Sequence, residues 1–302
     1  MKALKVLPIA LLLTASFALA QTNTNQQPAS TAPAAQQQSK PGNFTIGSAP
    51  APAPKQQPQA KSKPEYDAYV AMMALKDPSA MEKAADDFIT KFPDSELKAA
   101  AYERVMLMYQ QAGNDDKTIE MGQKSLTFNP DTPGVLVALS DTLVRGTHDT
   151  DLDKDQRLEQ ATRYAKHALE TVGDYPAPPN MPPEQVMSVK NDLRSAAYAS
   201  IGAAAYTNKK YADAEVNFRQ AVDVIKDNPD PTTMLRLALT LDKESKYADA
   251  LDQINKILAM PNLDPRVSSY AQQEKTRLTQ LAPAAKPASA PAAPTTAPST
   301  PK

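Results

Sequence analysis

The chain has 302 residues, 22% of them charged, with a formal net charge of −1. It contains no Cys, which excludes disulfides, thiolate metal sites and a Cys nucleophile. All 34 acidic residues but only 25 of the 33 Lys and Arg residues lie between Glu65 and Arg277. This acidic balance argues against nucleic acid as a partner, because binding to phosphates requires clustered cations.

The first twenty residues are typical of a secretory signal peptide. Two lysines precede an apolar run over residues 6–17, and Ala18 and Ala20 supply a small-x-small cleavage site. The run is shorter than the ~20 residues that span a bilayer, and Gln21 stands where a lipoprotein has Cys. We therefore expect cleavage after Ala20, a periplasmic or secreted location, no lipid anchor and no transmembrane segment in the mature chain. An uncleaved anchor is the alternative.

Two segments lack the large apolar side chains that offset the entropy of folding. Residues 21–63 are rich in Gln, Ala and Pro and contain Lys but no acid, and residues 282–302 are rich in Ala, Pro and Thr. We expect both to be disordered arms on either side of a helical domain over residues 64–281. The basic linker is interpreted as a solvated spacer, and contact with anionic cell-wall polymers is the alternative.

The part over residues 64–281 contains an internal repeat of about 34 residues. Frames start at Glu65, Ala99, Pro133, Ser195 and Pro231. In each frame apolar or small residues recur at the spacing of one helix face, so each frame is predicted to be a pair of helices. The inward positions of the first helices are Ala68, Ala71, Met72 and Leu75; Tyr102, Val105, Met106 and Tyr109; Leu136, Leu139, Ser140 and Leu143; Tyr198, Ile201, Gly202 and Ala205; and Met234, Leu237, Ala238 and Leu241. Those of the second helices are Ala84 and Phe88; Ala161, Ala165 and Ala168; Ala214, Phe218 and Ala221; and Ala250, Ile254 and Ile257.

The repeat is irregular in three places. In the second frame, Thr118 stands where Ala is usual and Gly122 stands where a large residue is usual. This predicts a loose joint, with poor packing between the helices of this frame. The third frame is lengthened, and a Pro-rich stretch at 175–183 precedes a long helix from 184 to about 206; such insertions fall on loops. A largely polar helix over 264–281 is expected to cap the stack.

The fourth frame resembles the tetratricopeptide repeat. Tyr198, Ile201 and Gly202 stand where the signature of that repeat has a large residue, Leu and Gly. Ala214, Phe218, Ala221 and Pro229 stand where it has Ala, Phe, Ala and Pro. The segment 88–109 is also similar to repeats of periplasmic envelope-assembly and Tol-Pal-associated proteins. The resemblance implies an all-α fold, an α-solenoid of tetratricopeptide-like antiparallel helix pairs, which binds other proteins.

In this family the concave face is lined by the first helix of each pair. Carried onto this chain, the groove positions are Glu103, Leu107, Gln110, Asp141, Val144, Ala199, Ala203, Tyr206, Leu235, Leu239 and Asp242. An apolar floor with acidic spots suits an amphipathic or basic-apolar peptide or helix. The Lys and Asn residues with which some members grip a terminal carboxylate are missing from these positions. The alternative is that Leu235 and Leu239 are covered by the capping helix or a neighbouring repeat.

Motifs that carry chemistry are few. The loop Asp149–Asp155 alternates carboxylates as calcium loops do, but it lacks the Gly and Glu that an EF-hand requires. A solvated insertion that caps the next helix is the favoured interpretation, and weak calcium binding is the alternative. His148 and His167 have no partner His or Cys nearby, and the chain has no phosphate-binding loop or nucleophile elbow. We expect no catalytic residues, no cofactor and no metal site.

These features predict a non-catalytic scaffold or adaptor of the bacterial cell envelope, with other envelope proteins as partners. Three alternatives remain. The first is a self-associating structural protein whose solenoids stack through their ends. The second is an accessory factor of cell-wall or outer-membrane assembly, and the third is an enzyme with a site assembled from scattered helix residues.

Overall fold

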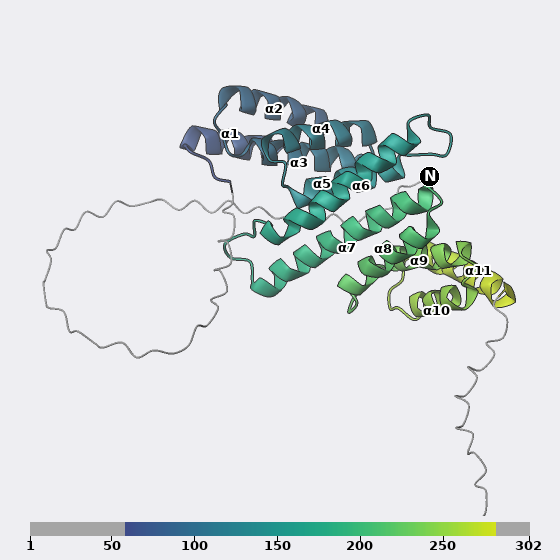
Figure 1. Cartoon of the computed structure of the whole chain (residues 1–302). Helices are drawn as coiled ribbons and strands as arrows, with labels where there is room; N and C mark the ends of the chain where they lie inside the picture. The colour runs from purple at the N-terminus through teal and green to yellow at the C-terminus, as the bar shows by residue number, and fades with distance from the viewer. Residues whose placement is uncertain (1–57, 282–302) are drawn as a thin grey trace, which may run out of the picture.

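The computed structural model describes residues 58–281, which form eleven α-helices and one short 3-10 helix (Figure 1). The predicted signal peptide, most of the predicted linker and the predicted C-terminal arm lie outside the described residues. The helices are α1 (Lys63–Met73), α2 (Pro78–Lys91), α3 (Lys98–Gln111), α4 (Asp115–Phe128), α5 (Pro133–Arg145), α6 (Lys154–Thr171), η1 (Val172–Asp174), α7 (Pro183–Thr207), α8 (Tyr211–Val224), α9 (Pro231–Lys243), α10 (Tyr247–Leu258) and α11 (Pro265–Leu281).

The helices pack in serial order. Each odd-numbered helix from α1 to α9 packs against the helix that follows it, and the second helix of every pair contacts the first helix of the next. Figure 1 shows the resulting stack, from α1 and α2 at one end to α11 at the other, with the long α7 through its middle. This chain of neighbour contacts defines an α-solenoid. The predicted all-α solenoid of tetratricopeptide-like helix pairs is confirmed.

The local sequence sets where the helices begin. Asp77, Asn114 and Asp230 each accept a hydrogen bond from the backbone N–H three residues ahead, at 2.8, 3.1 and 2.7 Å. Such N-caps satisfy backbone donors that the helix itself leaves free. Helices α2, α5, α7, α9 and α11 begin with Pro, whose fixed φ suits the first helical position and whose missing N–H costs nothing there.

Three of the helix pairs turn through a left-handed residue at the same place. Gly113, Lys209 and Ser245 have φ values of 71°, 59° and 61°, and each is the fifteenth residue of its frame. This conformation suits Gly and strains residues that carry a Cβ. The turn conformation therefore repeats with the same period as the apolar residues.

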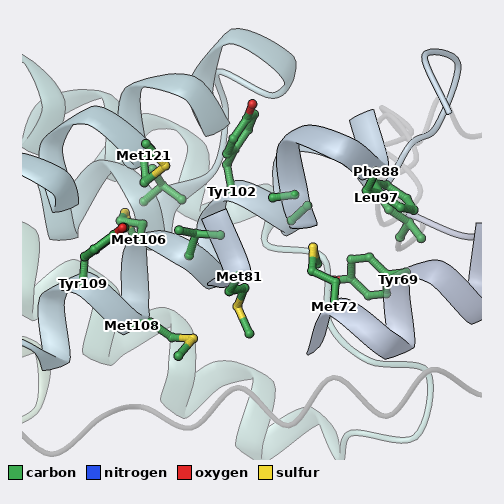
Figure 2. Close-up of a cluster of buried hydrophobic side chains, with 14 of the residues drawn as sticks. Tyr69, Met72, Met81, Phe88, Leu97, Tyr102, Met106, Met108, Tyr109 and Met121 are labelled. Atoms are coloured by element: carbon green, nitrogen blue, oxygen red, sulfur yellow. The ribbon is translucent and has the colours of Figure 1, made fainter. Parts of the chain in front are cut away.

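The N-terminal core is rich in Met and differs from the prediction in its first frame (Figure 2). Tyr69 is buried and its ring centroid lies 5.8 Å from that of Phe88, whereas the predicted Ala71 is exposed. In α2, Ala85 is fully buried, and the predicted Ala84 is only half-buried. No described helix precedes α1, so its rotation is decided by how Tyr69 packs against α2.

The other frames follow the predicted pattern closely. All twelve inward positions of α3, α5 and α9 are buried, as are the positions predicted for α6, α8 and α10. In α7, Ile201 and Gly202 are buried, whereas Tyr198 and Ala205 are half-buried. The apolar spacing thus identified the core faces of four of the five pairs.

The predicted loose joint at Gly122 is wrong, because large and small residues have exchanged places there. In the fourth frame, a Cβ at Gly202 would lie 2.9 Å from Phe218 Cδ1. In the second frame, the large residue is Met106 on the first helix and the small one is Gly122 on the second. A Cβ at Gly122 would lie 3.0 Å from Met106 Sδ and 2.7 Å from Leu139 Cδ2. Both joints are close-packed.

The insertions leave the stack intact. The extra residues of the third frame form the loop 146–153, and the Pro-rich stretch leads into α7, which still packs against α5, α6 and α8. Helix α11 packs on α10 and α9 and buries only Ala271 and Leu278, as expected of a polar cap. Among residues 58–281, no helix is both long and apolar enough to cross a membrane.

Candidate partner-binding groove

The eleven predicted groove residues all lie on α3, α5, α7 and α9, the first helices of four pairs. Nine of them are half-buried, and Val144 and Ala199 are buried with 9% and 8% of their surface exposed. Most of these side chains are therefore partly accessible to solvent. The positions on α3, α5 and α9 include one acid each, whereas those on α7 include none.

The capping helix reaches the C-terminal end of this groove. Arg277 on α11 forms an ion pair with Asp242 at 2.8 Å and a second with Glu274 at 2.7 Å. Leu235 packs against the C-terminal core cluster, whereas Leu239 belongs to none of the core clusters of the described residues. Both leucines are half-exposed, and of the two only Leu235 packs against a core cluster of the described residues.

At the other end of the predicted groove, the carboxyl group of Glu103 lies close to the backbone of Gly134. Glu103 on α3 is half-buried, and a Cβ added at Gly134 on α5 would lie 3.6 Å from its Oε1 atom. Loss of water around the carboxyl raises the pKa of Glu103 to about 7. Within residues 58–281, Glu103 has no hydrogen bond or ion pair that would offset this loss.

Sequence reasoning missed a buried tyrosine between η1 and α7. Tyr175, in the connection between η1 and α7, packs with Leu193 and Val137 and is only 9% exposed. Its hydroxyl is buried without a hydrogen-bond partner in the described part of the chain. Burial raises the pKa of Tyr175, and the charge of Glu103 raises it further. We define the Glu103 site as Glu103 and Gly134, which lie in contact.

The acidic loop is held by internal contacts. Asp149 pairs with Lys154 at 2.6 Å, Asp153 pairs with Arg157 at 3.0 Å, and Asp151 accepts a backbone hydrogen bond from within the loop at 2.7 Å. Asp153 is the N-cap residue of α6, but its side chain makes no capping hydrogen bond, so the expected capping role is not fulfilled. The described residues contain no group of three or more His, Cys, Asp or Glu side chains that could hold a metal ion.

His167 connects two parts of the third repeat. Its Nε2 atom lies 3.0 Å from Asp131 Oδ1, in the loop before α5, and its Nδ1 atom lies 3.3 Å from Glu170 Oε2.

A hollow of about 280 Å³ lies between α4, α5 and α6. The Arg157 side chain in its wall donates a hydrogen bond to the backbone carbonyl of Gly146 at 3.1 Å. These contacts give His167 and Arg157 structural roles in joining neighbouring segments.

No protein-family model matches the chain, and no curated protein matches it by sequence. Solved structures similar to it include a thermophilic TPR protein of Thermus thermophilus, at 17% identity over 70% of this chain and 98% of that one, with a TM-score of 0.47. PilF of Pseudomonas aeruginosa matches at 16% identity over 72% of this chain and 92% of its own, with a TM-score of 0.48. The Cut9–Hcn1 heterotetramer of the APC/C matches at 16% identity over 70% of this chain and 37% of that one, with a TM-score of 0.48.

Proposed function

We propose that this protein is a non-catalytic scaffold of the bacterial cell envelope, which binds a peptide or helix of a partner protein along the groove formed by α3, α5, α7 and α9. The observation that carries the proposal is that Leu107, Ala203 and Leu239 on these helices are half-exposed, and that Leu239 packs against none of the core clusters, whereas Leu107 and Ala203 do. The same predicted positions include the half-exposed acids Glu103 and Asp141. An apolar strip with acidic flanks is complementary to a helix or peptide with one apolar face and basic neighbours. The signal-peptide features of residues 1–20 support the envelope location.

Leu239 offers the sharpest test of the groove. Leu239→Glu places a charge in the groove at a position outside the core clusters, so the protein should still fold. The control is Val216→Glu, on the second helix α8, where the side chain is 57% exposed. Each protein is immobilised, exposed to an envelope extract of the host, and compared by the partners that mass spectrometry identifies.

We expect both variants to keep the helical circular dichroism of the wild type and only Leu239→Glu to lose a discrete partner. If Leu239→Glu unfolds, Leu239 is a core residue and the groove as defined here is wrong. If both variants retain the same partner, the partner binds elsewhere. Cell fractionation and the mass of the mature chain test the location, for which we expect an N-terminus at Gln21.

Self-association is the second candidate function, and one observation favours it. Val70 on α1 and Tyr270 on α11, at opposite ends of the stack, are 44% and 48% exposed. Stacking of one copy on the next would cover both side chains. Sedimentation measured over a dilution series tests this: a mass that falls on dilution, and that Val70→Asp reduces to the monomer, would favour self-association over the scaffold.

A further inference from the structure

We propose that the connector between η1 and α7, residues 175–182, covers the α5 part of the groove in the free protein and is displaced by the bound partner. This inference rests on the proposed function and adds a competitor and a partner chemistry to it. Tyr175 takes the place of an apolar side chain of the partner, so the partner segment carries an aromatic residue that fits the same contacts.

The first line of support is where the connector lies. Val137 on α5 is the fifth residue of its frame, the place that Glu103 and Leu235 hold in theirs on the predicted concave face. Tyr175 and Leu193 form a buried apolar cluster, and Val137 packs against it. The connector joins the end of the second helix α6 to α7 (Figure 1), yet its first residue reaches the first helix α5. It therefore covers a groove position.

The second line of support is the unequal burial of the connector. Tyr175 is 9% exposed, whereas Pro179, Asn180 and Pro182 are exposed. One aromatic ring thus anchors a segment whose other end faces solvent. A peptide held in a groove by one aromatic anchor has the same distribution of burial.

The third line of support is that few interactions hold the ring in place. Among residues 58–281, the Tyr175 hydroxyl has no hydrogen-bond partner, and the Tyr175 N–H donates to the Val172 carbonyl within the preceding turn, at 3.3 Å. Apolar contact alone therefore holds the ring against α5. Release of the ring would return the buried hydroxyl to water, which lowers the cost of displacement.

The backbone of the connector is also suited to displacement. Four of its eight residues are Pro, which has no N–H with which to bond a neighbouring helix. The turn before the connector is fixed separately, since Lys190 Nζ on α7 donates to the Gly173 carbonyl at 2.6 Å. The connector can therefore leave α5 while α6, η1 and α7 stay in place.

The test uses a tryptophan reporter and a peptide selected from a random library displayed on phage. The chain contains no Trp, so Tyr175→Trp places a single reporter at the anchor position. The library is selected on the immobilised full-length Tyr175→Ala protein. The affinity of a selected Trp-free peptide is measured by fluorescence anisotropy for the wild type, Tyr175→Ala, Leu239→Glu and the control Tyr270→Ala, whose ring on α11 is 48% exposed. Circular dichroism checks that each variant is folded.

We expect the selected peptides to share an aromatic residue. Tyr175→Ala should bind the peptide about tenfold more tightly than the wild type, as expected if the connector is docked in about nine of ten wild-type molecules. Tyr270→Ala should bind like the wild type. In Tyr175→Trp, saturation with the peptide should shift the emission to longer wavelength, because the ring moves from a buried site into water.

The outcomes separate this inference from the proposed function. If Leu239→Glu abolishes binding but Tyr175→Ala binds no more tightly than the wild type and the Trp emission stays unchanged, the groove binds peptides and Tyr175 is a fixed core residue. If Tyr175→Ala unfolds, the library is selected on the wild type and the emission shift alone decides. If no peptide is selected, or if Leu239→Glu has no effect on binding, both the inference and the proposed function fail.

Discussion

Adding one methyl group at Gly202 is expected to destabilise the protein, although Ala is the better helix former. The added Cβ would lie 2.9 Å from Cδ1 and 3.0 Å from Cε1 and Cγ of Phe218, whose side chain is 1% exposed. Ordinary carbon contacts are about 3.5–4.0 Å, so the ring or α7 must move by roughly 0.5–1 Å. Overpacking of this kind costs about 1–3 kcal/mol, and the helix propensity of Ala returns about 1 kcal/mol. The net loss is up to about 2 kcal/mol.

Urea unfolding followed by far-UV circular dichroism measures this loss. Gly173→Ala is the control, because a Cβ at Gly173 would meet nothing within 4 Å. In a Phe218→Leu background the cost of Gly202→Ala should shrink, since the smaller side chain leaves room for the methyl group. An unfolding midpoint for Gly202→Ala at or above that of the wild type would refute the close helix crossing.

Three further predictions use the same unfolding assay. Lys209→Gly should stabilise the protein by about 0.5–1 kcal/mol, because Lys209 holds φ at 59° where the second frame has Gly113; a lower midpoint would contradict the strain. Asp230→Ala should cost about 1 kcal/mol through loss of the 2.7 Å N-cap bond of α9, and Asp230→Asn, which keeps an acceptor, should cost less. Glu103→Gln should match the wild type at about pH 4 and exceed its stability by about 1–3 kcal/mol at about pH 8. Burial raises the pKa of Glu103 from 4.5 to about 7, so the native carboxyl keeps a proton that the unfolded chain releases, and the wild type loses stability as the pH rises between these values. An equal difference at both pH values would show that Glu103 is hydrated.

The helix pairs could be predicted from the sequence because their signals are local. Positions three, four and seven residues apart share one helix face wherever the chain goes next, so the buried faces of α3, α5 and α9 follow from spacing alone. The prediction failed in α1, where Ala71 is exposed and Tyr69 is buried. Ala occurs both in the core and on the surface, so the spacing of Ala residues in α1 did not define which face of that helix is buried.

The partners of small residues could not be predicted. Gly122 was expected to leave a gap, but Leu139 of the next pair fills it. The sequence specifies the size of each residue, and only the packing of α4 against α5 decides which large side chain occupies the space beside a small one. The same holds for Asp242, whose ion pair with Arg277 depends on where the capping helix lies.

The sequence by itself determined the architecture of this protein: helix pairs repeated about every 34 residues, with the core faces of four of the five pairs, because each of these depends on residues within one or two helical turns. Only the tertiary structure decided the Glu103 site. Glu103 and Gly134 come from two different repeats, and no local periodicity relates them. Their contact depends on how α3 and α5 stack, and burial in this stack raises the pKa of Glu103.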